Sequence, residues 1–298
     1  MSHASTHLDN GQWIEIHHPT TTDLEFLQSE FPFLHSVNVK DSLERVTHAK
    51  MSFTNDYLFL AITVPTGLSK EGRLENFEAI FFLTKDALIT IVPGDRRFPG
   101  LTVTTPGSFA KDSGLLLYEL LRGLYAESND AIREIVAKVG AIDNQILSIQ
   151  SPAIIREMAI LQINLTYFIT TLEASIPIFL ELEREDTHFN RESMKHYWSD
   201  IADFLTEQRD VLHDQDAILT TLSRAHGMYM NHRTNYIISI LTVFSAIFLP
   251  LNLIAGIYGM NLSYIPFSHG PESFAIVLGI MVVTALSFFA YLKWKQWT

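Results

Sequence analysis

The chain has 298 residues, of which 47% are hydrophobic, and a formal net charge of −12. Because nucleic-acid binding needs a basic surface that releases counterions, this acidic balance argues against a general nucleic-acid-binding protein. The absence of cysteine excludes disulfides and thiolate metal sites. Residues 1–12 lack the charged-then-apolar pattern of a secretion signal, so we expect membrane insertion to come from the carboxy-terminal part.

Residues 1–125 predict an α/β domain that faces the cytosol. Apolar β-type runs alternate here with turn residues such as Asn55 and Asp56. The expected strands include residues 57–64, 78–83 and 88–92, the last two joined as a hairpin through 84–87, and short helices are expected at 22–30 and 41–45.

Residues 126–235 predict a cytosolic helical region that ends in a long stalk. Helical patterning begins near Ser113, and Pro177 is a candidate kink. The three long helices are expected at residues 130–150, at 152–185 and from 191 onward. No proline separates the third helix from the apolar run that follows, so we expect one continuous helix.

The third helix carries an apolar seam with the three-four spacing of helices that pack side by side. Gln208 and Gln215 share its register, so the seam is partly polar. Its apolar members are Ile201, Phe204, Leu205, Val211, Leu212, Ile218, Leu219, Leu222 and Ala225. The alternative interpretation is an amphipathic helix that packs only within its own domain.

Two apolar runs, 236–257 and 274–292, contain no charged residue and are long enough to cross a bilayer. Arg224 and Arg233 precede the first run, and Lys293 and Lys295 follow the second. The loop at 258–273 has no Lys or Arg, so both chain ends, including the basic tail 293–298, are expected in the cytoplasm. The sequence therefore predicts a multi-pass protein of the plasma or inner membrane, with lipid as a partner.

The first apolar run contains polar residues on one side. Placed at 100° per residue, five of them fall within an arc of roughly 140°; these are Asn235, Ser239, Thr242, Ser245 and Asn252. Serine and threonine often bond to their own helix, and small polar residues also join helices. The asparagine amides are harder to satisfy in hydrocarbon, which favours a polar path surrounded by several copies of the chain.

Enzyme-like patterns are weak. A cluster at Asp210, His213, Asp214 and Asp216 has metal-ligand residue types, but a solvated helix face is the simpler interpretation. The pair His17-His18 is likewise expected at the surface. No phosphate-binding glycine loop or nucleophile elbow occurs, so we expect no enzyme activity and no cofactor.

The stretch Pro250-Leu-Asn-Leu-Ile-Ala-Gly-Ile-Tyr-Gly-Met-Asn261 resembles the CorA family of magnesium transporters, whose hallmark is Gly-Met-Asn at the end of the first of two spans. The resemblance implies an α+β membrane protein: a cytosolic α/β domain, a long helical stalk and two carboxy-terminal transmembrane helices, assembled as a homopentameric funnel. It implies Mg²⁺ as the substrate and as a regulatory ligand.

The resemblance also implies roles for individual residues. Gly259, Met260 and Asn261 would form the selectivity filter, and Ile238 and Leu241 the gate. The pore-facing positions would be Asn235, Ile238, Leu241, Ser245, Leu249, Asn252, Tyr258 and Asn261, whereas the polar arc favours Thr242 over Leu241. Asp200, with Asp203 nearby, would hold a regulatory intracellular divalent ion; the alternative is that both are merely solvated.

The sequence departs from the family in places. Relatives often carry acidic residues just after the tripeptide, where this chain has residues 262–267 without an acid, leaving Glu272 alone in the loop. Arg224 stands where relatives can have an acidic residue, and Asn252 where they can have threonine. Two alternatives stay open: a zinc, cobalt or nickel transporter of the same fold, with or without proton coupling, and a non-conducting membrane-anchored metal sensor.

Overall fold

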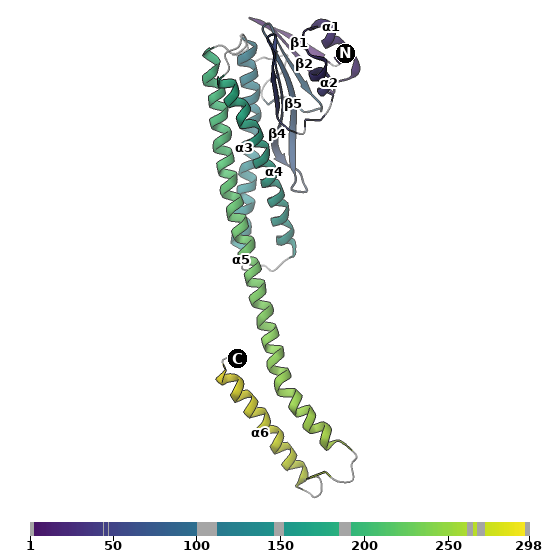
Figure 1. Cartoon of the computed structure of the whole chain (residues 1–298), viewed down its shortest axis with the longest axis vertical. Coiled ribbons are helices and arrows are strands. Elements are labelled where there is room, and N and C mark those ends of the chain that lie inside the picture. Colours follow the sequence, from purple (N-terminus) through teal and green to yellow (C-terminus); the bar gives the residue numbers. More distant parts are fainter. Residues whose placement is uncertain are drawn as a thin grey trace. The chain divides into compact units, whose positions relative to one another are not determined.

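The computed structural model describes residues 3–43, 45–46, 48–99, 112–145, 152–184, 192–260, 265–266 and 272–295. Contacts within the chain divide it into two compact units, an amino-terminal unit, Met1–Ser223, and a carboxy-terminal unit, Arg224–Thr298. One helix, α5, has residues in both units (Figure 1).

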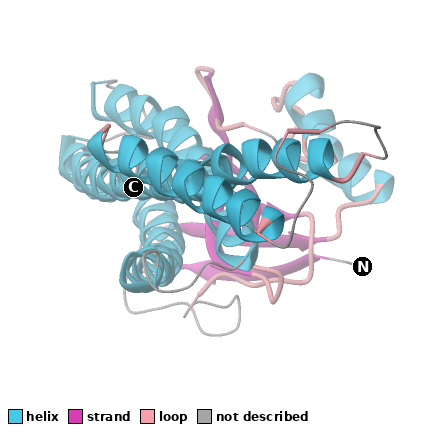
Figure 2. Cartoon of the chain, turned by 90° about the horizontal axis from the view of Figure 1, so that it is seen from below, coloured by secondary structure: helices cyan, strands magenta, loops and turns pink. Residues whose placement is uncertain are grey.

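The amino-terminal unit contains one six-stranded sheet with the order β1-β2-β6-β5-β4-β3, whose strands are magenta in Figure 2. All neighbours are antiparallel except β2 and β6, which pair in parallel although 70 residues or more separate them in sequence. The strands are β1 His3–Leu8, β2 Gly11–His17, β3 Lys50–Phe53, β4 Tyr57–Leu68, β5 Leu74–Thr84 and β6 Ala87–Val92. The predicted hairpin is confirmed as β5 and β6.

Both faces of this sheet are covered. Because side chains alternate along a strand, Leu58 and Leu60 of β4 join one apolar core while Tyr57 and Phe59 join the other. The first core contains buried residues of α3, α4 and α5, and the second those of α1 and α2. Figure 1 shows these helices on opposite sides of the strands.

The two short helices only partly match the sequence expectation. Helix α1, Thr21–Glu30, is confirmed, and a reciprocal capping box between Thr20 and Asp23 starts it. Helix α2 spans Ser36–Asp41, so the predicted helix at 41–45 was wrong. The imidazole of His35 accepts a hydrogen bond from the Val37 amide and sets the start of α2 five residues earlier than expected.

Three long helices, α3 Ser113–Gln145, α4 Pro152–Arg184 and α5 Glu192–Tyr258, follow the sheet. The first is one helix of 33 residues rather than the expected segment from residue 130. Side-chain hydrogen bonds show their relative directions. From α3, Tyr118 bonds to Asp200 of α5, and Ser128, farther along α3, bonds to Gln208, farther along α5. From α4 the order is reversed: Gln162 bonds to Asp216, and the later Glu173 bonds to the earlier His213. Helix α5 is therefore parallel to α3 and antiparallel to α4.

The seam on α5 separates into two rows. The inner row, Leu205, Leu212 and Leu219, is fully buried in the core that α3 and α4 share. Gln208 lies with it and bonds to the Ser128 hydroxyl and the Tyr125 carbonyl of α3. This part of the seam packs within its own domain, as the alternative interpretation held. The outer row, Phe204, Val211 and Ile218, is half-buried or exposed.

The carboxy-terminal unit consists of the rest of α5 and helix α6, Ser273–Trp294. Three helices of the described chain, α4, α5 and α6, are long and apolar enough to cross a membrane. Half of the most apolar stretch of α4 is buried within the fold, against 0% for α5 and 6% for α6. Helices α5 and α6 contain the apolar runs at 236–257 and 274–292.

Candidate ion-conducting helix

The polar side chains of the carboxy-terminal half of α5 differ in how they are satisfied. The Thr242 hydroxyl donates to the Ile238 carbonyl of its own helix at 2.7 Å, which is the local explanation available for hydroxyl side chains. Asn235, Ser245 and Asn252 are exposed and make no hydrogen bond within the part of the chain that the structure describes. The two amides and the Ser245 hydroxyl thus remain without a partner among the described residues, and the amides are the costlier groups to leave in hydrocarbon.

Bulky apolar side chains accompany these amides. Ile238 is 55% exposed, Leu241 66% and Leu249 75%. A single chain therefore leaves both candidate gate residues, Ile238 and Leu241, uncovered. The resemblance places Leu241 toward the pore, whereas the polar arc places Thr242 there. Both side chains are exposed in the single chain, so both positions stay open.

The tripeptide lies just beyond the end of α5. Tyr258 is the last helical residue and is half-buried, and the Gly259 amide still donates to the Ala255 carbonyl at 2.9 Å. A Cβ at Gly259 would lie 3.1 Å from that carbonyl oxygen, so a side chain there would push against the last turn. Met260 is 53% exposed, and Asn261 lies outside the described residues.

Pro250 lies inside α5, about two turns before its end at Tyr258. Because proline has no amide hydrogen, the carbonyl of Ala246 lacks its usual helical donor. In a membrane-spanning helix such a carbonyl needs another polar partner or water. Pro250 thus adds a backbone acceptor to the same stretch that carries Asn252.

Asp200, the expected regulatory ligand, is already bonded within the chain. Its Oδ2 accepts a hydrogen bond from the Tyr118 hydroxyl at 2.9 Å and lies 3.3 Å from the Arg122 Nε. The Arg122 guanidinium also lies over the Phe204 ring, 4.3 Å from its centroid. The Arg122 guanidinium is therefore the cation that lies beside the Asp200 carboxylate in the single chain.

The electrostatics of this cluster follow from that arrangement. Burial raises the pKa of Tyr118 above its ordinary value, and its hydrogen bond to Asp200 and the carboxylate charge raise this pKa further, while Arg122 lowers it. Tyr118 thus stays a neutral donor at physiological pH. Burial also raises the pKa of Glu119 on the same helix.

The cluster does not form a metal site by itself. Asp203 is exposed and its side chain has no partner among the described residues, where no group of three or more His, Asp or Glu side chains forms a metal site either. A divalent ion at Asp200 would need ligands from another copy of the chain and would compete with Arg122.

The other candidate metal cluster does not converge. Asp210 bonds to its neighbour Arg209, His213 lies 3.3 Å from Glu173, and Asp216 accepts from Gln162. These side chains point to different partners, in agreement with a solvated helix face. His17 contacts Glu15 at 3.1 Å and is only 24% exposed, so it is less open than the sequence suggested, while His18 is exposed beside Asp95.

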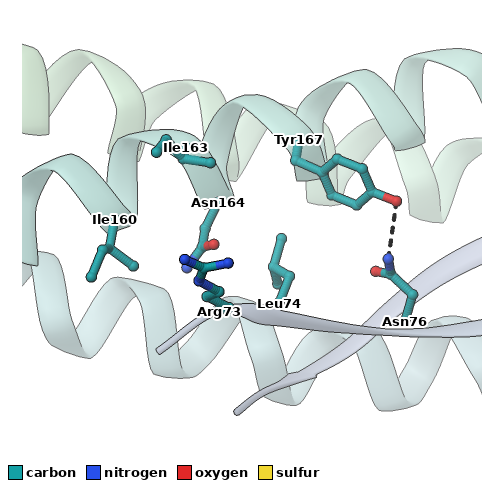
Figure 3. Close-up of a pocket in the computed structure, with 7 residues that line it drawn as sticks. All are labelled: Arg73, Leu74, Asn76, Ile160, Ile163, Asn164 and Tyr167. Carbon is teal, nitrogen blue, oxygen red and sulfur yellow. Dashed lines mark hydrogen bonds between the residues drawn. The ribbon is translucent and has the colours of Figure 1, made fainter. Parts of the chain in front are cut away.

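A separate pocket of about 400 Å³ lies in the amino-terminal unit between α4 and the start of β5 (Figure 3). Leu74, Ile160 and Ile163 give it an apolar lining, and the Asn76 amide donates to the Tyr167 hydroxyl at 3.0 Å across it. It contains none of the residues predicted for the ion path or for regulation.

Sequence reasoning missed Tyr118 and Arg122 as partners of Asp200. They lie 82 and 78 residues before it, on a different helix, and no local pattern links the two segments. The only signal in the sequence was that Arg122 lies in the segment whose helical patterning begins near Ser113.

Comparisons with known proteins agree on one family. The family model described as "CorA-like Mg2+ transporter protein" matches residues 9–294. A putative metal ion transporter, YfjQ, of Bacillus subtilis is 24% identical over 289 residues, covering 96% of this chain and 89% of the relative. A cobalt/magnesium transport protein CorA of Thermotoga maritima is 24% identical over 290 residues, covering 96% and 83%.

Solved structures share the fold. The complete structure of the CorA magnesium transporter from Methanocaldococcus jannaschii has a TM-score of 0.82 at 21% identity, covering 97% of this chain and 92% of that one. The full-length CmaX protein has a TM-score of 0.77 at 16% identity, covering 95% and 89%. At these identities the likeness concerns the fold alone.

Proposed function

The chain belongs to the CorA-like Mg²⁺ transporter family, and on that premise we propose that several copies, most simply five, surround a path lined by α5 through which hydrated Mg²⁺ crosses the plasma or inner membrane. At the coarser level the chain is a divalent cation transporter of this family. The finer proposal also keeps the predicted division at residues 125, 235, 257, 273 and 292, with both termini in the cytoplasm.

One observation supports the path most directly. The Asn235 and Asn252 amides are exposed on an apolar helix and have no partner among the described residues. An amide left in hydrocarbon costs several kcal/mol, about 4 to 8 on the strictest scale. Water in a path between copies removes that cost, and the same helix face repeats once in every copy.

The chemistry of Mg²⁺ fits such a path. This ion gives up its hydration shell reluctantly, so neutral groups that bind its waters suit it better than carboxylates that replace them. We assign that role to a ring of Asn261 amides, with their oxygens accepting hydrogen bonds from the bound waters. An inside-negative potential of about 100 mV favours entry of the two charges by about 4.6 kcal/mol.

Closure of the path is assigned to the apolar residues between the amides. Ile238 and Leu241 are exposed in the single chain, and rings of such side chains can close a path by expelling water. The outer row, Phe204, Val211 and Ile218, recurs every seven residues and offers an apolar contact for a neighbouring copy.

Regulation is assigned to Asp200 and Asp203. When internal Mg²⁺ is abundant, Asp200 and Asp203 would hold it in place of Arg122, and the bound charge would join neighbouring amino-terminal units and keep the path closed. When the ion is lost, Arg122 takes its place and the units separate. This assignment rests on the position of Asp200 at the surface of α5, with its side chain 49% exposed.

The proposal is tested with purified protein in liposomes that contain a Mg²⁺-sensitive dye. Asn261→Ala should abolish Mg²⁺ entry, whereas Asn144→Ala, an amide on α3 that bonds its own Gly140 carbonyl, should leave it unchanged. Wild-type flux in Asn261→Ala would remove that residue from the mechanism.

The same liposomes separate the rival functions. Parallel measurements with Co²⁺, Ni²⁺ and Zn²⁺ identify the preferred ion, and a pH gradient tests proton coupling. The absence of flux for every ion, from a protein that remains assembled, would instead indicate a metal sensor.

A further inference from the structure

The stretch of α5 that leads into the apolar run carries an unusual set of charges. From Ala217 to Pro271 the sequence contains no aspartate or glutamate, and its only permanently charged residues are Arg224 and Arg233. Both arginines are exposed, and neither makes an ion pair within the described residues. This stretch of a helix proposed to conduct cations therefore offers fixed positive charge and no negative charge.

The two arginines lie on opposite sides of α5. Nine residues separate them, which at 100° per residue places their side chains about 180° apart. Arg224 precedes Asn235 by eleven residues, three turns to within about 20°, so it shares the face of that amide. Arg233 lies on the face away from it.

A supercoiled arrangement gives the same assignment. On a 3.5-residue repeat Arg224 precedes Asn231, Ile238, Ser245 and Asn252 by one, two, three and four heptads, so it continues the row that contains the pore positions. Either helix geometry places Arg224, and not Arg233, on the side of the proposed path.

Their distances from the apolar run also differ. Arg224 lies twelve residues, about 18 Å, before Tyr236, too far to reach a lipid headgroup along the helix. Arg233 lies about 4.5 Å before it, where a cation contacts the anionic membrane surface. Arg233 thus has the role of a membrane anchor, whereas Arg224 is too far from the membrane for that role.

We propose that Arg224 forms a ring of guanidinium groups at the cytosolic end of the ion path and that this ring limits the rate at which divalent cations pass. The inference rests on the proposed assembly around α5. A like-charged ring lowers the local concentration of cations, and it does so most strongly at low ionic strength, where charges are poorly screened.

The test compares three variants in liposomes with equal KCl on both sides. At about 0.01 M salt Arg224→Gln should raise the initial rate of Mg²⁺ entry by roughly tenfold, the low end of rate effects from surface potential. At about 1 M salt, where the Debye length is about 3 Å, the difference should disappear. Arg224→Lys keeps the charge and should match wild type, and Arg233→Gln removes the same charge from the opposite face and should not raise the rate.

The outcomes separate the two proposals. Equal rates for Arg224→Gln and Arg233→Gln at low salt, with wild type active, would overturn the guanidinium ring alone. Faster flux in Arg224→Lys as well would overturn it too, because the charge is then not the cause. Inactive wild-type protein would overturn the proposed function and the ring together. Size-exclusion profiles that match wild type show that each variant is assembled.

Discussion

The two halves of α5 bury their apolar residues in opposite ways. In the amino-terminal unit Leu205, Leu212 and Leu219 are 0% exposed, whereas in the carboxy-terminal unit Leu241 is 66% and Leu249 75% exposed. The helix is continuous between them. The difference therefore comes from what surrounds each half and not from its own residues.

This contrast shows which half the chain can stabilise by itself. The first half is covered by α3 and α4, so its apolar side chains gain burial within one chain. The second half leaves apolar surface uncovered, at a cost of about 25 cal/mol per Å² in water. Lipid and other copies of the chain are the partners that remove this cost.

The largest difference between the two halves is expected when one leucine in each is shortened to alanine. Leu212→Ala should lower the free energy of unfolding of the amino-terminal unit by about 2 to 5 kcal/mol, because it leaves a cavity in a packed core. Leu249→Ala should leave that free energy unchanged. Denaturant unfolding in detergent, followed by the fluorescence of Trp13 and Trp198, both buried in that unit, measures both.

The opposite result would contradict the independence of the two halves. Similar destabilisation by the two variants would mean that the halves unfold together, and the division at Ser223 would then have no energetic meaning.

A second prediction concerns the outer row on the first half. Val211→Asp with Ile218→Asp should separate the assembled copies without unfolding the chain, because these residues are 37% and 44% exposed and neither belongs to the buried core. We expect a loss of about 1 kcal/mol of association free energy per side chain. Mass measurement by light scattering in detergent would detect it.

The matched control for that experiment is Met230→Asp, an exposed position farther along the same helix and off the seven-residue row. An assembly that survives the double substitution at positions 211 and 218 would show that another surface holds the copies together.

A smaller effect is expected at Asp200. Arg122→Gln removes the internal cation from the carboxylate, and a half-exposed ion pair contributes about 0.2 to 1 kcal/mol. Mg²⁺ should therefore bind up to about fivefold more tightly, as measured by calorimetry on the assembled protein. Asp200→Asn should abolish this binding; unchanged affinity in Arg122→Gln would show that Arg122 does not compete.

Much of this arrangement could be predicted from local sequence patterns. The run of β-branched and aromatic residues at 57–64 predicted β4, and the two uncharged runs near the carboxy terminus predicted the apolar parts of α5 and α6. These signals are local, since each depends on residues within one element.

Long-range pairing could not be predicted in this way. The parallel contact of β2 with β6 and the bonds from Tyr118 and Arg122 to Asp200 join segments that share no local pattern. The seam on α5 shows the same limit: adjacent residues such as Leu212 and Val211 read alike in sequence, and only the position of α3 and α4 decides which one is buried. The start of α2 was misplaced because the cap came from a histidine.

The smallest expected effect separates hydroxyls from amides on the second half of α5. Thr242→Val should change Mg²⁺ flux by less than about twofold, because the hydroxyl already donates to the Ile238 carbonyl and threonine and valine have nearly the same shape. Asn252→Leu, also close in size, should reduce flux much more, because its amide has no partner in the described chain and is available to water in the path. Paired flux measurements in the same liposomes decide this. A large loss in Thr242→Val would place that hydroxyl, rather than Leu241, toward the ion, and equal tolerance of both variants would mean that the unpaired amides are not what makes this helix conduct.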